Sequence, residues 1–293
     1  MHLLNKLNTN LHKVMALPAI LLFGLFFIYP LTRGVGISLT DWNGVTDAEF
    51  VGLQNFFDFF KDDRAKHDLY TTVLFALGSA PLLNIFGFIY ALILDRNFKG
   101  KVIVRAIVYL PAVISPLIMG YVWYFILQPQ RGFLHHILEN ANMGFLNANW
   151  LGDPSTTIKV LILVNVWQYV GVTMIVYLAG LQSIPGELYE SSKIDGAGYF
   201  STLRFITIPM LYPAIKINVV TNIIGSLAVF DVIVALTDGG PGYSTESLSI
   251  YILRMLYGSF TGYSTAVALI LFIIIIIPVF LFLRLTKSKE IDM

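Results

Sequence analysis

One stretch decides the fold of this chain: ELYESSKIDGAGYFSTLRFITIPMLYP, residues 187–213. It carries charges, glycines and two late prolines, whereas long apolar segments lie on both sides of it. Glu187 and Glu190 fall in the first turns of a short predicted helix, where the helix dipole favours negative charge. Gly196 and Gly198 are predicted to end that helix, because glycine accepts the left-handed conformation of a helix terminus. The stretch is therefore predicted to form a short amphipathic helix between two apolar segments.

The composition places the apolar segments in a membrane. Of the 293 residues, 56% are hydrophobic and 13% are charged, whereas soluble domains carry about 25% charged residues. The chain has no cysteine, which excludes disulfides, thiolate metal sites and cysteine nucleophiles. A formal net charge of +1 gives no overall field that would favour nucleic acid as a partner. Membrane lipid is the predicted surrounding.

Six apolar segments are long enough to cross a hydrocarbon core of about 30 Å at about 1.5 Å per residue. The predicted fold class is an all-α integral membrane protein with six transmembrane helices, and residues 1–293 are predicted to form a single transmembrane domain. The predicted spans are approximately residues 13–37, 69–94, 104–127, 158–181, 208–235 and 263–284.

Lysine and arginine placement sets the predicted orientation. Loops on the cytoplasmic side of a membrane carry an excess of these residues, and the excess falls on the inner side when both termini are cytoplasmic. The inner loops are then residues 95–103 and 182–207. The outer loops are residues 38–68, 128–157 and 236–262, and the last of these contains TDGGPGYST, a stretch of tight turns.

An amphipathic helix on the inner side has two possible roles. Such a helix is shaped to dock into a groove on a cytoplasmic partner. A solvated connector with incidental helicity is the alternative, and the residues alone leave both open.

The same loop resembles the EAA loop of the permeases of ABC importers. That pattern is Glu-Ala-Ala, three residues, Gly, nine residues and Ile-x-Leu-Pro. This chain has Glu190-Ser191-Ser192, then Gly196, then Ile206-Thr207-Ile208-Pro209, with the same spacing. It departs in having Ser for both alanines and Ile for Leu, and serine is small enough to keep the close packing. FVGLQNF, YLPAVISPLIMGYVW and LTDGGPGYSTESLSIYI are similar to the same family in the expected order, so the likeness covers nearly the whole chain.

The resemblance implies a type I ABC importer permease fold with a cytoplasmic coupling (EAA) helix, most similar to the first permease chain of maltose-permease-like systems. It implies a bacterial or archaeal cytoplasmic membrane, a second, different permease chain, two ATPase subunits or a homodimeric ATPase, and an extracytoplasmic solute-binding protein. The chain has no G-x-x-x-x-G-K-[ST] phosphate loop, so it is predicted to be a transport subunit and no enzyme, with ATP and Mg bound by the ATPase partner. The resemblance implies that Glu190 contacts the ATPase and that Gly196 forms the turn, although the turn could also be structural alone. The residues assigned to coupling with the ATPase are Glu187, Glu190, Ser191, Ser192, Asp195 and Gly196.

Polar side chains within two spans are candidates for the solute path, because polar groups in a membrane face partners or water. Asn165 and Gln168 lie three residues apart on one helix face, with Trp167 beside them. Spans that flank the coupling loop form the sugar site in the resembling family. Interhelical hydrogen bonding is the alternative role. In the fifth span, Asn222, Ser226 and Phe230 repeat every four residues, and Asp231 lies near the outer end as a gate contact or an interfacial residue.

Amides and hydroxyls pair with sugar hydroxyls, and aromatic rings stack on apolar sugar faces. No lysine or arginine falls near the middle of a span, which favours a neutral solute. The predicted function is therefore an importer permease that moves a sugar or oligosaccharide into the cytoplasm by alternating access. The same importer class with a polyol phosphate as solute is an alternative, and so is an ion-coupled secondary transporter, although the spans lack a midplane acid for a coupling ion.

Overall fold

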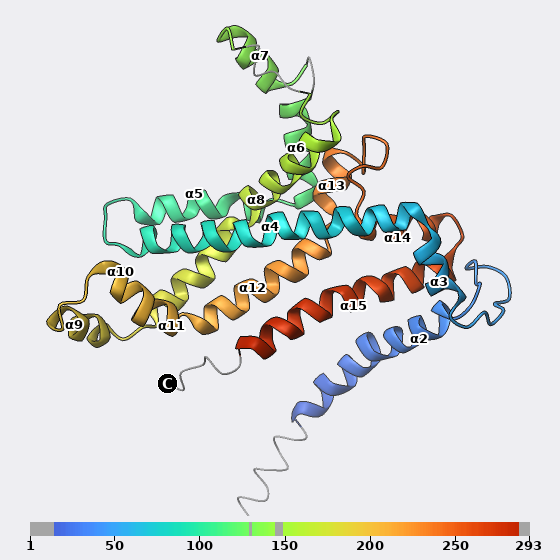
Figure 1. The fold of residues 1–293 in the computed structure, drawn as a ribbon, viewed down its shortest axis with the longest axis horizontal. Coiled ribbons are helices and arrows are strands. Elements are labelled where there is room, and N and C mark those ends of the chain that lie inside the picture. The colour runs from blue at the N-terminus through green and yellow to red at the C-terminus, as the bar shows by residue number, and fades with distance from the viewer. Residues whose placement is uncertain (1–14, 129–130, 144–148, 287–293) are drawn as a thin grey trace, which may run out of the picture. The chain divides into compact units, whose positions relative to one another are not determined.

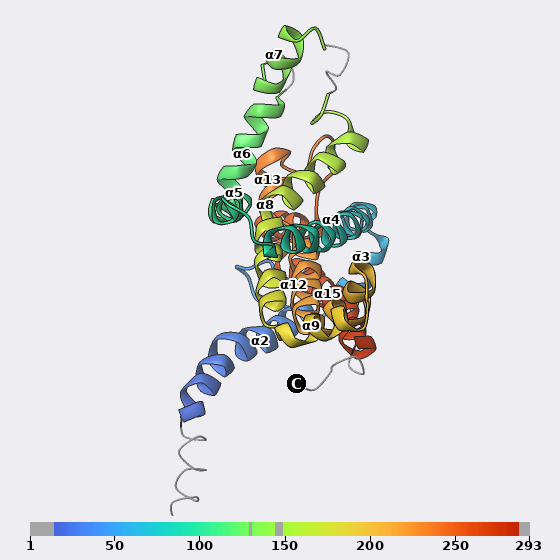
Figure 2. The same cartoon turned by 90° about the vertical axis from the view of Figure 1, so that its left-hand side faces the viewer.

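A computed structural model describes residues 15–128, 131–143 and 149–286, and these residues form helices joined by loops (Figures 1 and 2). The predicted all-α class is confirmed. The first two residues of the predicted span 13–37 and both chain ends, which were predicted to be cytoplasmic, lie outside the described residues. The described helices are η1 (Gly24–Ile28), α2 (Tyr29–Ser38), α3 (Gln54–Lys61), α4 (Asp63–Asp95), α5 (Lys101–Val113), α6 (Pro116–Leu127), α7 (Phe133–Asn140), α8 (Pro154–Gln182), α9 (Gly186–Ile194), α10 (Tyr199–Thr202), η3 (Leu203–Thr207), α11 (Ile208–Met210), α12 (Tyr212–Leu227), α13 (Asp231–Leu236), α14 (Leu248–Tyr257) and α15 (Thr261–Thr286).

Four helices among the described residues are long and apolar enough to cross a membrane without a break: Met15–Ser38, α4, α8 and α15. Two further candidates are broken pairs, α5 with α6, bent by 97°, and Tyr199–Met210 with α12, bent by 70°. The described residues therefore hold four candidate spans, or up to six if each broken pair is one span.

Two of the predicted spans, residues 104–127 and 208–235, are each interrupted by a break between two helices. Between α5 and α6, Ser115 has an extended backbone with ψ 131°, because a residue that precedes a proline is disfavoured in the helical conformation. Pro116 then begins α6, where its missing N–H costs nothing. In the fifth segment, α12 ends at Leu227 and α13 begins only at Asp231.

The chain divides into two compact units, and the larger one contains residues 63–251 and 271–293. Its centre is α8, which packs against α4, α5 and α12. Glycines allow close approach of these helices: a Cβ on Gly171 would lie 2.4 Å from the carbonyl oxygen of Val108 in α5, and a Cβ on Gly87 would lie 2.6 Å from Cγ2 of Thr173. Small residues at helix interfaces are typical of membrane proteins, where van der Waals packing drives helix association.

The smaller unit contains residues 1–62 and 252–270. Its loop after α2 is held by Asn55, whose Nδ2 donates to the carbonyl oxygens of Ser38 and Thr40 at 2.8 Å each. The backbone N–H of Gly262, at the start of α15, donates to the carbonyl of Trp42 at 2.8 Å. These bonds satisfy backbone groups that the loop would otherwise leave without a partner.

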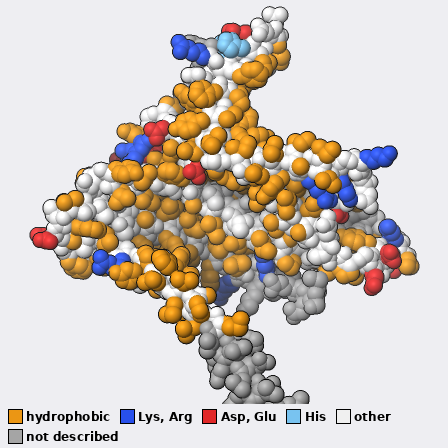
Figure 3. Space-filling model, turned by 180° about the vertical axis from the view of Figure 1, so that it is seen from behind, with side chains coloured by type: hydrophobic (Ala, Val, Ile, Leu, Met, Phe, Trp, Pro, Cys, Tyr) orange, Lys and Arg blue, Asp and Glu red, His pale blue; other side chains and the backbone are white. Residues whose placement is uncertain are grey.

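The described surface is unusually apolar for a protein in water. Hydrophobic side chains cover most of the face shown in Figure 3, and charged side chains occur there in small groups. Phe26 in the first span is 73% exposed and Ile277 in α15 is 58% exposed. Soluble proteins rarely expose such large contiguous apolar surface, so these helices are suited to lipid or to other membrane helices.

Candidate functional site

The break between α12 and α13 opens a cavity of about 330 Å³ in the larger unit. At this break Ala228 caps α12, and Phe230 has a non-helical backbone with φ −142° and ψ −64°. Ser247 Oγ donates to the carbonyl oxygen of Val229 at 2.8 Å, which satisfies a backbone group that the break frees. The cavity is lined by Leu83, Pro116, Asn165, Tyr169, Val172, Thr221, Asn222, Gly225, Ser226, Ala228, Val229, Phe230, Asp231 and Val232.

The structure brings five of the seven predicted solute-path residues to this cavity: Asn165, Asn222, Ser226, Phe230 and Asp231. The two amides and the hydroxyl come from α8 and α12, the ring from the break, and the carboxylate from the first residue of α13. The mixture of hydrogen-bonding groups and apolar wall is typical of a small-molecule site.

The amides of the cavity also bond between helices. Asn165 Nδ2 donates to Ser79 Oγ at 2.6 Å, and Asn222 Nδ2 donates to Thr173 Oγ1 at 3.3 Å. Both of the roles considered for these residues, cavity lining and helix bonding, therefore occur together. Ser226 differs from these two asparagines. It is only 2% exposed, and its Oγ has no hydrogen-bond partner among the described residues.

Trp167 and Gln168 do not line this cavity. Trp167 lies on another face of α8 and lines a separate cavity of about 380 Å³ with Trp123 and Trp150. Its ring meets that of Trp123 edge to face, with centroids 5.3 Å apart. Gln168 is fully buried, and its Nε2 donates to the carbonyl of Ile114 at 3.3 Å, where α5 ends. The three-residue spacing of Asn165 and Gln168 was therefore insufficient to place both in one cavity.

The sequence interpretation missed several lining residues, including Tyr169, Thr221 and Gly225. A signal was present, because Tyr169 follows Asn165 by four residues and Gly225 follows Thr221 by four, the spacing of one helix face. Tyrosine and threonine are ordinary in membrane helices, so this spacing alone does not single them out.

A second candidate site is the loop between α8 and α12. Helix α9 ends as predicted: the N–H of Gly196 donates to the Lys193 carbonyl at 3.1 Å and the N–H of Ala197 to the Ser192 carbonyl at 2.9 Å. Gly196 has φ +75°, so the pair of bonds closes the helix in a Schellman motif. The predicted helix and its end at Gly196 are confirmed, whereas the prediction for Gly198 is wrong, because Gly198 has φ −76° and caps the start of α10. The role of the helix in coupling stays a prediction.

The predicted coupling residues differ in exposure. Glu187, Glu190, Ser191, Asp195 and Gly196 are exposed. Ser192 is buried, and its Oγ donates to the Tyr189 carbonyl at 2.9 Å. The side chain of Ser192 therefore packs inside the loop and is not available for contact with a partner.

Large apolar side chains stand out from the same loop. Ile194 is 87% exposed and Phe200 is 81% exposed. On a segment that also carries several charged residues, such exposure is typical of a protein-binding surface.

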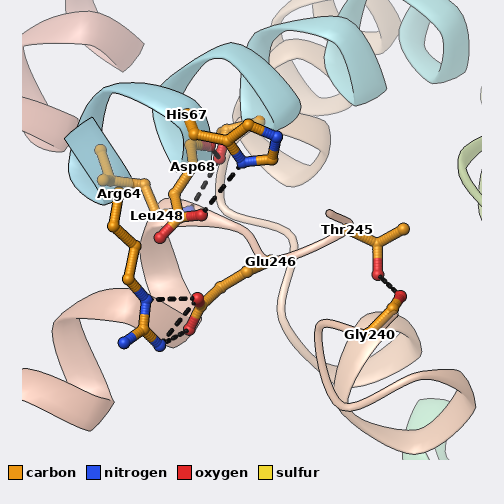
Figure 4. A network of polar contacts seen from close by, with 8 residues as sticks. Arg64, His67, Asp68, Gly240, Thr245, Glu246 and Leu248 are labelled. Atoms are coloured by element: carbon orange, nitrogen blue, oxygen red, sulfur yellow. Dashed lines mark hydrogen bonds and ion pairs between the residues drawn. The ribbon is translucent and has the colours of Figure 1, made fainter. Parts of the chain in front are cut away.

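A buried ion pair holds the loop between α13 and α14 in the larger unit (Figure 4). Arg64, at the start of α4, donates from Nε to Glu246 Oε2 at 2.9 Å and from Nη2 to Glu246 Oε1 at 3.1 Å. The guanidinium also lies over the Tyr243 ring, 3.8 Å from its centroid. Next to Glu246, the backbone N–H of Leu248 donates to Thr72 Oγ1 at 2.8 Å. The loop is thus fixed to α4 by both side-chain and backbone contacts.

Apolar outer faces, two broken helices and polar groups turned toward an internal cavity define a class of protein: a multi-span membrane transport protein. The family model described as "Binding-protein-dependent transport system inner membrane component" matches residues 83–289. The chain belongs to this family, and it is a multi-pass permease component of an ABC importer in the plasma membrane.

Curated relatives match along most of the chain. The probable starch degradation products transport system permease protein AmyD of Thermoanaerobacterium thermosulfurigenes is 30% identical, over 94% of each chain. The trehalose/maltose transport system permease protein MalF of Thermococcus litoralis is 32% identical, over 90% of this chain and 89% of the relative. A chain in the crystal structure of a bacterial ABC transporter involved in the import of the acidic polysaccharide alginate superposes with a TM-score of 0.82 at 26% identity, covering 98% of this chain and 99% of that one.

Proposed function

We propose that this permease carries a sugar or oligosaccharide into the cytoplasm, and that the cavity at the α12–α13 break is part of the solute path. One observation carries the proposal: amide, hydroxyl and aromatic groups line the same cavity of about 330 Å³. The transport systems named for AmyD and MalF, which carry starch degradation products and trehalose or maltose, support a carbohydrate as solute. No lysine or arginine is among the described lining residues, which disfavours the polyol phosphate alternative.

The energy for transport comes from a separate ATPase, two subunits or a homodimer, which bind ATP and Mg. The loop residues Glu187, Glu190, Ser191, Asp195 and Gly196 form the docking surface for it, while Ser192 holds the loop together from inside. Exposure of the first five and of neighbouring apolar side chains supports this role. When the ATPase closes, α9 transmits the motion to α8 and α12, between which it lies in the chain, and the path changes its side of access.

The complete importer contains a second, different permease chain and an extracytoplasmic solute-binding protein. The family description, which names dependence on a binding protein, supports the latter. Both termini of this chain lie in the cytoplasm, and residues 1–293 act as one permease domain. The placement of lysine and arginine supports this orientation.

The test of the solute class is stimulation of ATP hydrolysis in the reconstituted complex with its binding protein. The panel contains neutral oligosaccharides, uronic-acid sugars and polyol phosphates. Stimulation by a neutral oligosaccharide is the expected result. Stimulation by a polyol phosphate alone would keep the importer class and refute the proposed solute.

Two glycines of the loop provide a matched test of coupling. A Cβ added at Gly196 or at Gly198 would meet no atom within 4 Å. The two glycines differ in backbone conformation, because Gly196 has φ +75° and Gly198 has φ −76°. Gly196→Val is expected to abolish solute-stimulated ATP hydrolysis, because a β-branched residue disfavours the left-handed conformation that ends α9. Gly198→Val is expected to retain most of the stimulation. Equal activity of the two variants would contradict a role for the α9 terminus in coupling.

Cysteine cross-linking tests the docking surface directly, because the chain has no cysteine of its own. Ser191→Cys is expected to form a disulfide in high yield with a cysteine placed in the groove of the ATPase. Ser192→Cys is the matched control. Ser192 is only 5% exposed, so we expect almost no cross-link from a cysteine at this position. Failure of Ser191→Cys across several groove positions, detected on non-reducing gels, would argue against docking at α9.

A further inference from the structure

The cavity at the α12–α13 break carries negative charge and no positive charge among its described lining residues. Among the described residues that line it, only Asp231 carries a formal charge. Its side chain is exposed, and it forms no ion pair with any side chain in the described part of the chain. No ion pair in the described part of the chain therefore neutralises this negative charge, and the charge acts on a solute that enters the cavity.

The remaining polar groups of the cavity are neutral. Thr221 and Asn222 bring a hydroxyl and an amide to the cavity, and Ser226 lines it from a buried position on α12. The Ser226 hydroxyl is without a hydrogen-bond partner among the described residues. These groups bind hydroxyls of a solute equally well whether or not the solute is charged elsewhere, so they do not distinguish a neutral sugar from an acidic one.

We propose that Asp231 is a specificity-determining residue that excludes anionic saccharides from the path and admits neutral ones. The inference rests on the proposed function, because it concerns the solute of the same cavity. Repulsion between like charges about 4 Å apart lowers occupancy about 5-fold in water, and by more where apolar walls reduce the effective dielectric. An approaching uronate carboxylate meets this repulsion, and no cation in the described lining compensates it.

The overall fold does not impose this selectivity. The alginate importer named above takes an acidic polysaccharide and contains a chain that superposes on this one over 98% of its length. The discrimination between acidic and neutral saccharides must therefore lie in individual side chains. Asp231 is the charged side chain in the described lining of this cavity, so it is the candidate for this discrimination.

Thiol labelling measures the field of Asp231 without knowledge of the solute. A single cysteine at Thr221, an exposed lining residue, reacts with an anionic reagent, 2-sulfonatoethyl methanethiosulfonate, and with a cationic one, 2-(trimethylammonium)ethyl methanethiosulfonate. The ratio of the two rates is measured in the purified complex by mass spectrometry of this chain. Asp231→Asn is expected to raise the anionic-to-cationic ratio about 10-fold, whereas Asp231→Glu is expected to keep it low.

A cysteine at Trp167 is the matched control, because this residue is 42% exposed and lines the other cavity. Its labelling ratio is expected to be the same with Asp231 and with Asp231→Asn. A ratio at Thr221→Cys that does not respond to Asp231→Asn would overturn the proposal. An equal response at both positions would overturn it as well, since the field would not belong to this cavity.

The second measurement uses the neutral oligosaccharide that stimulates the complex and a uronate oligosaccharide of the same length. The ratio of uronate to neutral uptake in proteoliposomes is expected to rise about 10-fold in Asp231→Asn, and an unchanged ratio would overturn the role in specificity. A shifted labelling ratio in a complex that carries no saccharide would refute the proposed function itself, so the two failures are distinguishable.

Discussion

Replacing Arg64 with methionine is expected to destabilise the folded chain by about 3 kcal/mol, the scale found when one partner of a buried ion pair is removed. The Glu246 side chain is fully buried, whereas that of Arg64 is 31% exposed. Loss of the guanidinium leaves a carboxylate that water cannot reach. Glu246→Gln is expected to cost less, because the Arg64 head retains access to water and to the Tyr243 ring.

The free energy of unfolding is measured by titration with a denaturing detergent in mixed micelles, followed by tryptophan fluorescence. The double variant Arg64→Met/Glu246→Leu is the control. Apolar replacement of both partners of a buried pair is often close to neutral, so the double variant is expected to recover most of the loss. A double variant less stable than Arg64→Met would show that the pair does not act through its charges.

Gly171→Ala is expected to destabilise the α5–α8 packing by about 2–3 kcal/mol, in the range for overpacking of a rigid interior. The added Cβ would lie 2.4 Å from the Val108 carbonyl oxygen and 2.7 Å from Tyr109 Cα. Both are backbone atoms, so the helices themselves must separate. The fraction of monodisperse protein that survives heating in detergent, measured by size-exclusion chromatography, gives the effect as a fall in the midpoint temperature.

Gly36→Ala is the matched control for this substitution. Gly36 also lies within a helix, α2, and a Cβ there meets nothing within 4 Å. Alanine has a higher helix propensity than glycine by about 1 kcal/mol, so Gly36→Ala is expected to leave the midpoint unchanged or slightly raised. Equal losses in the two variants would mean that the close contact at Gly171 is not the cause.

The positions of the apolar segments could be predicted from the sequence, but the points at which their helices break and bend could not. A hydropathy window sums apolar residues and does not register whether a helix continues or turns. At Ser115 the following proline was visible, yet Pro111 and Pro278 stand within helices α5 and α15 without ending them. The break after Leu227 contains Ala228, Val229 and Phe230, and no residue there announces a turn. It is stabilised from a distance, by the Ser247 hydroxyl.

The candidate site was predictable to the extent that it follows one helix. Asn222 and Ser226 were found because their four-residue spacing marks one face of α12, and the structure keeps them together. Trp167 was misplaced because adjacent residues on a helix point in directions about 100° apart. The pairing of Arg64 with Glu246 joins residues 182 positions apart, and nothing local in either segment indicates it.

The loop between α13 and α14 differs from the cavity in how freely its residues can change during evolution. Thr245, Glu246 and Ser247 are fully buried and bonded to the rest of the unit, so most substitutions there reduce stability before they alter anything else. Thr221, Gly225 and Asp231 line the cavity but are exposed, and exposed positions accept substitution at little cost in stability. A lineage adapting to a new nutrient is therefore free to vary the wall of the cavity while the loop that supports its edge stays constant.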